Sequence, residues 1–314
     1  MKNTPSRRAL LAASFLIPSC VMTAVFAVCA LAPFGTRTLG VMDMAHQYLP
    51  FLYSLRDILS GRTDIFYLPS MCLGGNMLGA AAYYLTSPLN LICCLFPRGR
   101  MYTAVSLLYI LRTGLCGLTM CAYAGSRRGW TVRCLIPAAA YAFSGYMVGY
   151  CFNYLWHDSV VLLPVIALGI SRIHAGKRPW MYILSLAGAL YLNFYIGYIL
   201  CIFSVLFFLF ELLSVPLRER TDTGRVLLRF ALGSLAAGAL AAVLLVPAFL
   251  SLRNGKASFD LSILTLSPQF TLPELLSKFY PAAFRYEEIM PEGLPQVFCG
   301  TVTVCLDSGG AACL

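Results

Sequence analysis

Four polar side chains with acid–base or hydrogen-bonding chemistry stand close together between Asp43 and Tyr48, about ten residues after a long apolar run ends. A carboxylate can take a proton from a reacting hydroxyl, and His46, Gln47 and Tyr48 can hydrogen-bond to a substrate. On a helical turn, positions 43, 46 and 47 share one face. The pattern predicts a catalytic or binding site opened by Asp43. The structural alternative, compatible with the first, is that Asp43 caps a short helix running through 51–59.

A second polar group follows at Trp156-His157-Asp158. An acid beside a histidine at a membrane boundary can position a phosphate, bind a metal or cap the next helix, and Asp158 is a candidate N-cap for a span beginning at Ser159. A tryptophan is common at a membrane interface whatever the function. Ligand binding and capping therefore both remain open for these residues. No metal-ligand spacing is present, so no metal site is predicted.

Two further candidates lie between these groups. Asn76 follows the pair Gly74-Gly75, which permits a close backbone approach to a ligand but equally marks a plain turn. Tyr84 follows another tyrosine, and such a pair can bind a substrate or belong to an interfacial aromatic belt.

Arg112 and Asn193 complete the set of candidate binding residues. Arg112 lies in the middle of an apolar run, where a charge is costly and faces a partner or a watery cavity. An anionic lipid phosphate and an acid on a neighbouring helix are equally good explanations for it. Asn193 stands at the end of another apolar run, where it can bind a sugar hydroxyl or close a helix end.

The composition identifies the environment in which these residues act. Hydrophobic residues make up 59% of the 314 residues, charged residues 11%, and the mean hydropathy is +0.76. Because a soluble domain has roughly a quarter of its residues charged, a soluble globular protein is excluded. The net charge of +10 does not predict a nucleic-acid partner, because no basic stripe carries interleaved aromatic residues.

Runs of about 20 apolar residues predict membrane-spanning helices. Seven such runs fall near 9–33, 101–124, 134–151, 159–173, 180–193, 196–215 and 226–250. The apolar stretch 77–96 is interrupted by Thr86, Ser87 and Pro88, which favours a re-entrant or interfacial segment over a full crossing.

The distribution of basic residues predicts the orientation. Thirteen Lys and Arg residues lie in four short segments, 1–8, 125–133, 172–179 and 216–229. The longer alternate segments 34–100 and 251–298 hold five and four. The positive-inside rule places the first set, and the N-terminus, in the cytoplasm. Asp43, Trp156–Asp158 and Asn193 then share the outer face.

These observations predict an all-α, polytopic transmembrane helix bundle in a cell membrane, with its N-terminus in the cytoplasm. Its core covers 1–250, with about seven spans and a long extracytoplasmic loop, 34–100, that carries short interfacial helices. An extracytoplasmic segment, 251–298, follows and has a short helix near Pro273–Phe279. The last residues, 299–314, look like the start of a further span, which suggests a truncated chain.

The candidate residues also resemble those of the bacterial YfhO family, multi-spanning proteins with a GT-C-type glycosyltransferase architecture. The resemblance covers about residues 5–306 in family order. It rests on Asp43-Met-Ala-His46-Gln47-Tyr48-Leu-Pro50-Phe51, Leu73-Gly-Gly-Asn76, Tyr84-Leu-Thr-Ser87-Pro88-Leu-Asn90, Ser144-Gly-Tyr146, Trp156-His-Asp158, Asn193-Phe-Tyr-Ile-Gly197-Tyr198 and Gly293-Leu-Pro295.

The resemblance implies transfer of a sugar from a polyprenyl-phosphate donor to a cell-envelope polymer such as teichoic acid, with Asp43 as the general base of an inverting reaction. The implied partners are the lipid-linked sugar, the polymer acceptor, membrane lipids and a membrane enzyme that makes the donor. No cofactor is implied. The chain departs from the family pattern at His157, and it has no Asp-x-Asp pair near Asp43 that would favour a metal.

Two other functions remain open from the sequence. A transporter or lipid flippase would place broken helices and charges at the bilayer midplane and would show repeated halves. Here Arg112 is the midplane charge, and no internal repeat is visible. A non-catalytic membrane scaffold is the third possibility.

Overall fold

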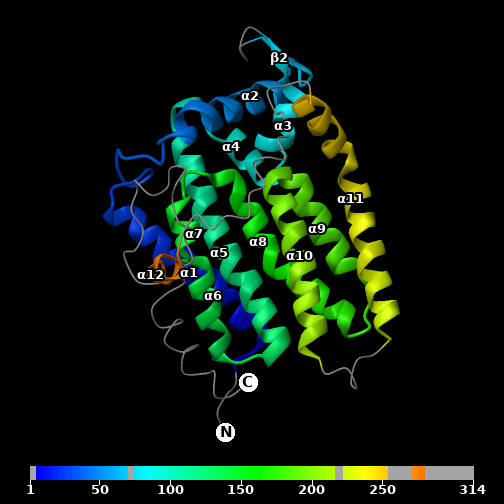
Figure 1. Ribbon diagram of the computed structural model, residues 1–314. Coiled ribbons are helices and arrows are strands. Elements are labelled where there is room, and N and C mark those ends of the chain that lie inside the picture. The colour runs from blue at the N-terminus through cyan, green and yellow to red at the C-terminus, as the bar shows by residue number, and fades with distance from the viewer. Residues whose placement is uncertain (1–4, 70–73, 216–221, 254–270, 280–314) are drawn as a thin grey trace. The chain divides into compact units, whose positions relative to one another are not determined.

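The computed structural model describes residues 5–69, 74–215, 222–253 and 271–279. These residues are almost entirely helical (Figure 1), apart from a two-stranded antiparallel ribbon of β1 (Tyr67–Leu68) and β2 (Gly75–Asn76). The predicted all-α class is therefore confirmed. The residues expected to form an extracytoplasmic segment and a further span, 251–298 and 299–314, lie mostly outside the described part.

The chain divides into two compact units. The first contains Met1–Val28, Tyr109–Cys151 and Ser258–Leu314, and the second contains Cys29–Leu108 and Phe152–Ala257. Helix α5 (Met101–Arg128) begins in the second unit and continues into the first.

In the first unit, α1 (Arg7–Val28) packs against α6 (Leu135–Ala142) and against the part of α5 that belongs to this unit. Small residues let the helices approach closely, as expected for packing in lipid, where the apolar solvent gives no hydrophobic drive. A Cβ at Gly114 would lie 2.8 Å from the Phe15 ring. Near the predicted cytoplasmic end, the guanidinium of Arg7 stands 4.6 Å from the centre of the Trp130 ring.

The predicted span 134–151 is not one helix, which corrects the sequence-based prediction. Helix α6 ends at Ala142, and a separate short helix, α7 (Gly145–Gly149), begins after Ser144. The Ser144 hydroxyl accepts a hydrogen bond from the Met147 backbone N–H, so a side chain that competes for the backbone starts a new helix there. Hydropathy does not register this break, because the residues on both sides are apolar.

The short helix predicted near 273–279 is present as α12 (Leu272–Ser277). Glu274 accepts from both the backbone N–H and the hydroxyl of Thr271, at 2.6 and 2.8 Å, as in a capping box. These hydrogen bonds stabilise the ionised carboxylate and lower the pKa of Glu274.

The second unit combines four long helices with a group of short elements at one end (Figure 1). The long helices are α8 (His157–His174), α9 (Trp180–Leu192), α10 (Phe194–Ser214) and α11 (Thr223–Arg253). The short elements are the π-helix η1 (Met44–Tyr48), α2 (Leu49–Leu59), α3 (Met77–Tyr84), η2 (Pro88–Asn90), α4 (Leu91–Cys94), η3 (Arg98–Arg100) and η5 (Tyr154–Trp156).

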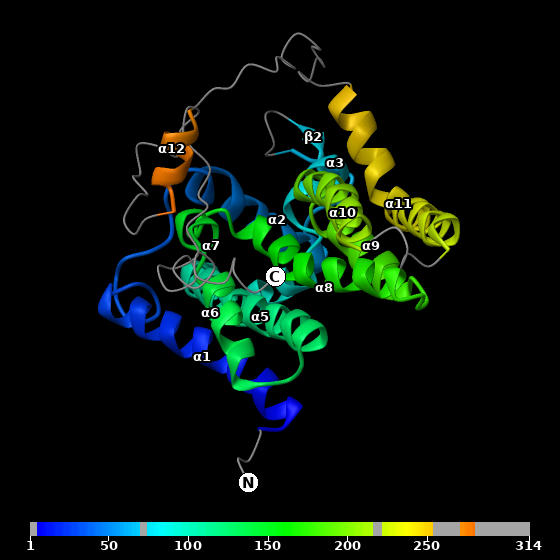
Figure 2. The same cartoon turned by 60° about the horizontal axis from the view of Figure 1, so that its bottom comes forward.

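Helix α9 is shorter than its neighbour α11, and α3 packs against the part of α11 that α9 does not reach. At ~1.5 Å per residue, α11 is about 46 Å long, α9 about 20 Å and α3 about 12 Å. Near the start of α9, the Tyr182 and Ser234 hydroxyls are 2.7 Å apart, whereas near the far end of α11 a Cβ at Gly79 of α3 would lie 2.5 Å from Ser251 Oγ. Helices α9 and α3 thus lie one after the other along α11, as Figures 1 and 2 show.

Five helices in the described ranges are long and apolar enough to cross a membrane. The count rises to six if the bent pair formed by 77–84 and 88–94 is one span, whose two parts meet at 96°. That bend agrees with the prediction of an interrupted segment at 77–96. The predicted span 180–193 is the short helix α9, which stops because Asn193 has an extended backbone (φ −161°, ψ 108°).

Candidate functional site

The backbone on both sides of Asp43 is unusual. Met42 has a φ of 48°, in the left-handed region that non-glycine residues seldom occupy. Directly after Asp43, residues Met44–Tyr48 form a π-helix, in which the Leu49 N–H bonds to the Met44 carbonyl. Backbone strain and π-helical turns both concentrate at functional sites. These two features therefore mark the Asp43 segment as a candidate site independently of its side chains.

A hydrogen-bonded chain of two side chains, Gln47 and Tyr84, holds the Asp43 carboxylate. The amide Nε2 of Gln47 donates to Asp43 Oδ1 at 3.3 Å, and the Tyr84 hydroxyl donates to Gln47 Oε1 at 2.8 Å. Because the tyrosine hydroxyl is the donor, the amide must turn its NH₂ group toward Asp43. Asp43 itself is exposed, and within the described residues no hydrogen bond reaches its second oxygen, Oδ2.

Aromatic rings lock Tyr84 in place. The Phe51 ring stacks on it with centroids 4.2 Å apart, and the rings of Tyr83 and Tyr48 lie at 4.7 and 5.8 Å. Because these contacts fix the orientation of the Tyr84 ring, its hydroxyl is directed toward Gln47.

Tyr48 anchors the π-helix to the start of η5, the short helix that leads into α8. Its buried hydroxyl donates to Asn153 Oδ1 at 2.7 Å, and its ring meets Tyr154 edge-on at 5.7 Å. Burial, followed by the nearby Tyr83 and Asp43, raises the pKa of Tyr48 well above its usual value, so the hydroxyl stays protonated and keeps donating.

Tyr83 joins three elements on the other side of Tyr84. Its hydroxyl accepts from Trp156 Nε1 at 3.2 Å, and its backbone carbonyl accepts from Asn193 Nδ2 at 3.0 Å. The half-exposed Tyr195 ring lies 6.1 Å from Trp156 and 6.4 Å from Tyr83. Hydrogen bonds and ring contacts therefore connect Asp43, through Tyr84 and Tyr83, to Asn193 at the start of α10.

Asn193 uses both ends of its amide for structure. Besides the bond to Tyr83, its Oδ1 accepts from the Ile196 N–H at 3.0 Å and caps α10. The side chain is completely buried. Thr86 and Asn90 act similarly, because Thr86 Oγ1 donates to the Leu192 carbonyl and Asn90 Nδ2 to the Tyr84 carbonyl. Polar side chains thus satisfy the carbonyls where the ends of α3 and α9 meet.

The remaining candidates occupy varied positions. His157 and Asp158 are buried in the first turn of α8, where a carboxylate is favourable near the positive end of the helix dipole. Since α8 begins at His157 and its N-cap is Trp156, the capping alternative for Asp158 is wrong. His46 is exposed on the π-helix. Asn76 pairs with Tyr67 in the β-ribbon.

Arg112 belongs to the first unit, whereas the residues described above belong to the second. Its side chain is fully buried on α5, inside a predicted span.

Within the described ranges, no three His, Cys, Asp or Glu side chains gather closely enough to hold a metal ion. The described side chains bring a carboxylate, an imidazole, amides, hydroxyls and aromatic rings to the site. These groups suit a neutral polyhydroxyl ligand, which hydrogen-bonds at its edge and packs its C–H face on rings.

Two residues that organise the site, Tyr83 and Asn153, were not singled out as site residues in the sequence. Tyr83 was noted only as one of a tyrosine pair, and its partners Trp156 and Asn193 lie 73 and 110 residues away. Asn153 bonds to Tyr48 across 105 residues. No local spacing signals such pairs.

Comparison with known proteins gives one match. A family model described as "Bacterial membrane protein YfhO" matches residues 13–306, which is most of the chain. No curated protein and no solved structure matches.

Proposed function

Because this chain belongs to the YfhO family of bacterial membrane proteins, we propose that it is a membrane glycosyltransferase. It would move a sugar from a polyprenyl-phosphate donor to a cell-envelope polymer such as teichoic acid, on the extracytoplasmic face. Asp43 would be the general base, and the lipid-linked sugar would be a substrate rather than a cofactor.

The proposal rests on the exposure and the hydrogen bonding of the Asp43 carboxylate. The carboxylate is exposed, and only its Oδ1 is held, by Gln47. A base must be oriented and must also present a free lone pair to the proton that it removes. Oδ2 meets that requirement.

The reaction balances with this one base. Oδ2 takes the proton of the acceptor hydroxyl while the hydroxyl oxygen attacks the anomeric carbon from the face opposite the phosphate. The new C–O bond forms as the bond from the anomeric carbon to the phosphate oxygen breaks, so the configuration inverts. Polyprenyl phosphate leaves with the bonding electron pair, and Asp43 passes its proton to water.

The aromatic side chains beyond Tyr84 support a sugar as the ligand. Trp156 and Tyr195 present partly exposed ring surface near Tyr83 and the side-chain amide of Asn193. Aromatic rings combine apolar area with a polar edge, which matches the two sides of a pyranose. We assign sugar packing to these rings and hydroxyl binding to the exposed His46.

The experiment uses membranes that contain the protein, a radiolabelled polyprenyl-phosphate sugar and the isolated polymer. We expect Asp43→Asn to lower transfer of label by about a hundredfold to ten-thousandfold, since the amide cannot accept the proton. The matched control is Asp64→Asn, the same change at an exposed acid of the same loop, whose Oδ1 accepts from the Phe66 N–H. Full transfer by Asp43→Asn would refute the assignment.

A transporter or lipid flippase is the alternative, which the fully buried Arg112 inside the candidate span Arg98–Arg128 favours. The same assay separates the two functions. A transporter moves the labelled lipid without attaching label covalently to the polymer.

A further inference from the structure

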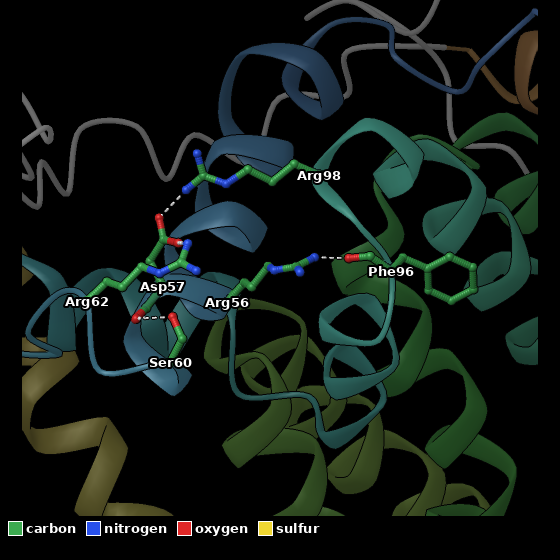
Figure 3. Close-up of polar contacts among 6 residues, drawn as sticks. All are labelled: Arg56, Asp57, Ser60, Arg62, Phe96 and Arg98. Atoms are coloured by element: carbon green, nitrogen blue, oxygen red, sulfur yellow. Dashed lines mark hydrogen bonds and ion pairs between the residues drawn. The ribbon is translucent and has the colours of Figure 1, made fainter.

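A cluster of arginines gathers around one carboxylate at the end of α2. Figure 3 shows Arg98 and Arg62 approaching Asp57 from different segments, with Arg56 turned toward Phe96. Arg98 Nη2 pairs with Asp57 Oδ2, and Arg62 Nη1 lies 3.5 Å from Asp57 Oδ1. Both ion pairs thus share the same acid, and Arg56 donates to the Phe96 carbonyl, which is neutral. The cluster therefore keeps a net positive charge.

The two outer guanidiniums remain open to a ligand. The side chains of Arg62 and Arg98 are 67% and 57% exposed, whereas that of Asp57 is 17% exposed. A guanidinium has five N–H donors, and one carboxylate cannot occupy those of two arginines. At 3.5 Å, Arg62 is attracted to Asp57 without a well-directed hydrogen bond. Arg62 can therefore turn toward a second anion at little cost.

Other contacts hold Arg98 in position. The Tyr53 hydroxyl donates to the Arg98 backbone carbonyl at 3.2 Å, and the guanidinium carbon lies 5.6 Å from the centre of the Tyr53 ring. The loop after α2 is also fixed, since the Arg62 N–H bonds to the Asp57 carbonyl at 2.8 Å. Asp57 and these backbone bonds therefore aim both arginines at the same region before a ligand arrives.

The location indicates which anion would bind. Arg98 begins the span Arg98–Arg128, at the end that the positive-inside rule places outside. That rule disfavours arginine at an outer membrane boundary, so these residues need another reason to be there. Exposed apolar side chains flank the cluster, with Leu59 56% and Leu95 82% exposed. Basic groups beside exposed apolar side chains are typical of a surface that binds lipid headgroups.

We infer that Arg62 and Arg98 form a binding site for the phosphate group of an outer-leaflet lipid. Guanidiniums bind phosphate oxygens in a planar, two-pronged geometry, and Leu59 and Leu95 would contact the acyl or prenyl chain. The site is distinct from Asp43, because η1 and α2 separate Asp43 from Asp57 by roughly 20 Å. The inference therefore stands whether or not the protein transfers sugar.

The test uses the full chain, purified in a phosphate-free detergent, with native mass spectrometry and thermal unfolding as readouts. Phosphatidylglycerol and a polyprenyl phosphate are the two phosphate lipids, and diacylglycerol is the phosphate-free control. We expect both phosphate lipids to bind and to raise the Tm, and diacylglycerol to do neither. Tighter binding of the polyprenyl phosphate would identify the donor-type lipid as the occupant, and equal binding would identify bulk anionic lipid.

The variant Arg62→Gln/Arg98→Gln should lower the affinity for phosphatidylglycerol at least about tenfold and remove the Tm increase. Arg37→Gln also removes one arginine charge at an exposed position of the same loop. It should change neither the affinity for phosphatidylglycerol nor the Tm increase. Arg62→Lys/Arg98→Lys keeps the charge and should still bind more weakly than the wild type. Because the readout is the difference in Tm with and without lipid, it holds even if the Gln variant is less stable. Unchanged binding by the Gln or Lys variant, or equal binding of diacylglycerol, would overturn the inference.

Discussion

The Tyr84 hydroxyl lies 2.8 Å from Gln47 Oε1, and this contact decides which way the Gln47 amide faces Asp43. The two residues come from α3 and η1, which are separated by a loop and the β-ribbon. Tyr84 thus acts as a positioning residue for the carboxylate, through Gln47. Both residues were predicted as substrate-binding, and the geometry adds this orienting role.

Tyr84→Phe should lower sugar transfer roughly tenfold, about 1.4 kcal/mol in barrier height, with little change in KM. The ring and its stacking on Phe51 remain, and only the hydroxyl that orients Gln47 is lost. Steady-state kinetics on membranes measures the effect. Tyr182→Phe, which removes a hydroxyl that is hydrogen-bonded to Ser234 between α9 and α11, is the matched control.

A double-mutant cycle separates positioning from general destabilisation. In a Gln47→Ala background, Tyr84→Phe should have almost no further effect on kcat, because the chain to Asp43 is already broken. Fully additive losses would contradict the positioning role of Tyr84. They would leave the role of Asp43 untouched, since Asp43→Asn tests that separately.

Asn193→Ala should destabilise the fold by about 2 kcal/mol or more, because it removes the α10 cap and leaves the Tyr83 carbonyl without its donor. Asn193→Ser keeps a capping oxygen and should lose only part of that stability. Thermal unfolding in detergent provides the measurement. Equal Tm values for the wild type and the Ala variant would refute the structural role.

Tyr48→Phe should cost about 1–3 kcal/mol of stability, because Asn153 Oδ1 is buried and loses its hydrogen-bond donor. Since burial raises the pKa of Tyr48, this stability is fully present below the usual tyrosine pKa and is lost as the pH rises from that value through the raised one. The difference in unfolding free energy between wild type and variant should therefore be the same at pH 7 and pH 9. A difference that disappears by pH 9 would contradict the assignment.

Gly79→Ala should destabilise the contact of α3 with α11 by about 1–3 kcal/mol, since the new Cβ would lie 2.5 Å from Ser251 Oγ. Among the described residues, and apart from the chain next to Gly79 itself, Ser251 contributes the only atoms within 4 Å of that position. Adding Ser251→Gly should therefore restore most of the lost Tm. Failure of the second change to rescue the first would mean that α3 does not pack on α11 at this point.

The sequence by itself determined the class of this protein. A charged fraction of 11% with long apolar runs requires a lipid environment, and helices satisfy their own backbone groups there. Local signals also predicted the interrupted segment at 77–96 and the helix near 273–279. These properties are visible in sequence because each depends on residues within one or two helical turns.

Only the tertiary structure decided how the candidate residues are used. The π-helix after Asp43, the break at Ser144 and the stacking of α3 on the end of α9 leave no distinctive trace in hydropathy. The sequence allows Asp43 to be a cap or a base, and in the structure its side chain makes no capping hydrogen bond and accepts one from Gln47 instead. Tyr48 with Asn153, and Tyr83 with Asn193, meet across more than a hundred residues. Such hydrogen bonds depend on where helices pack, which a one-dimensional pattern of polarity does not specify.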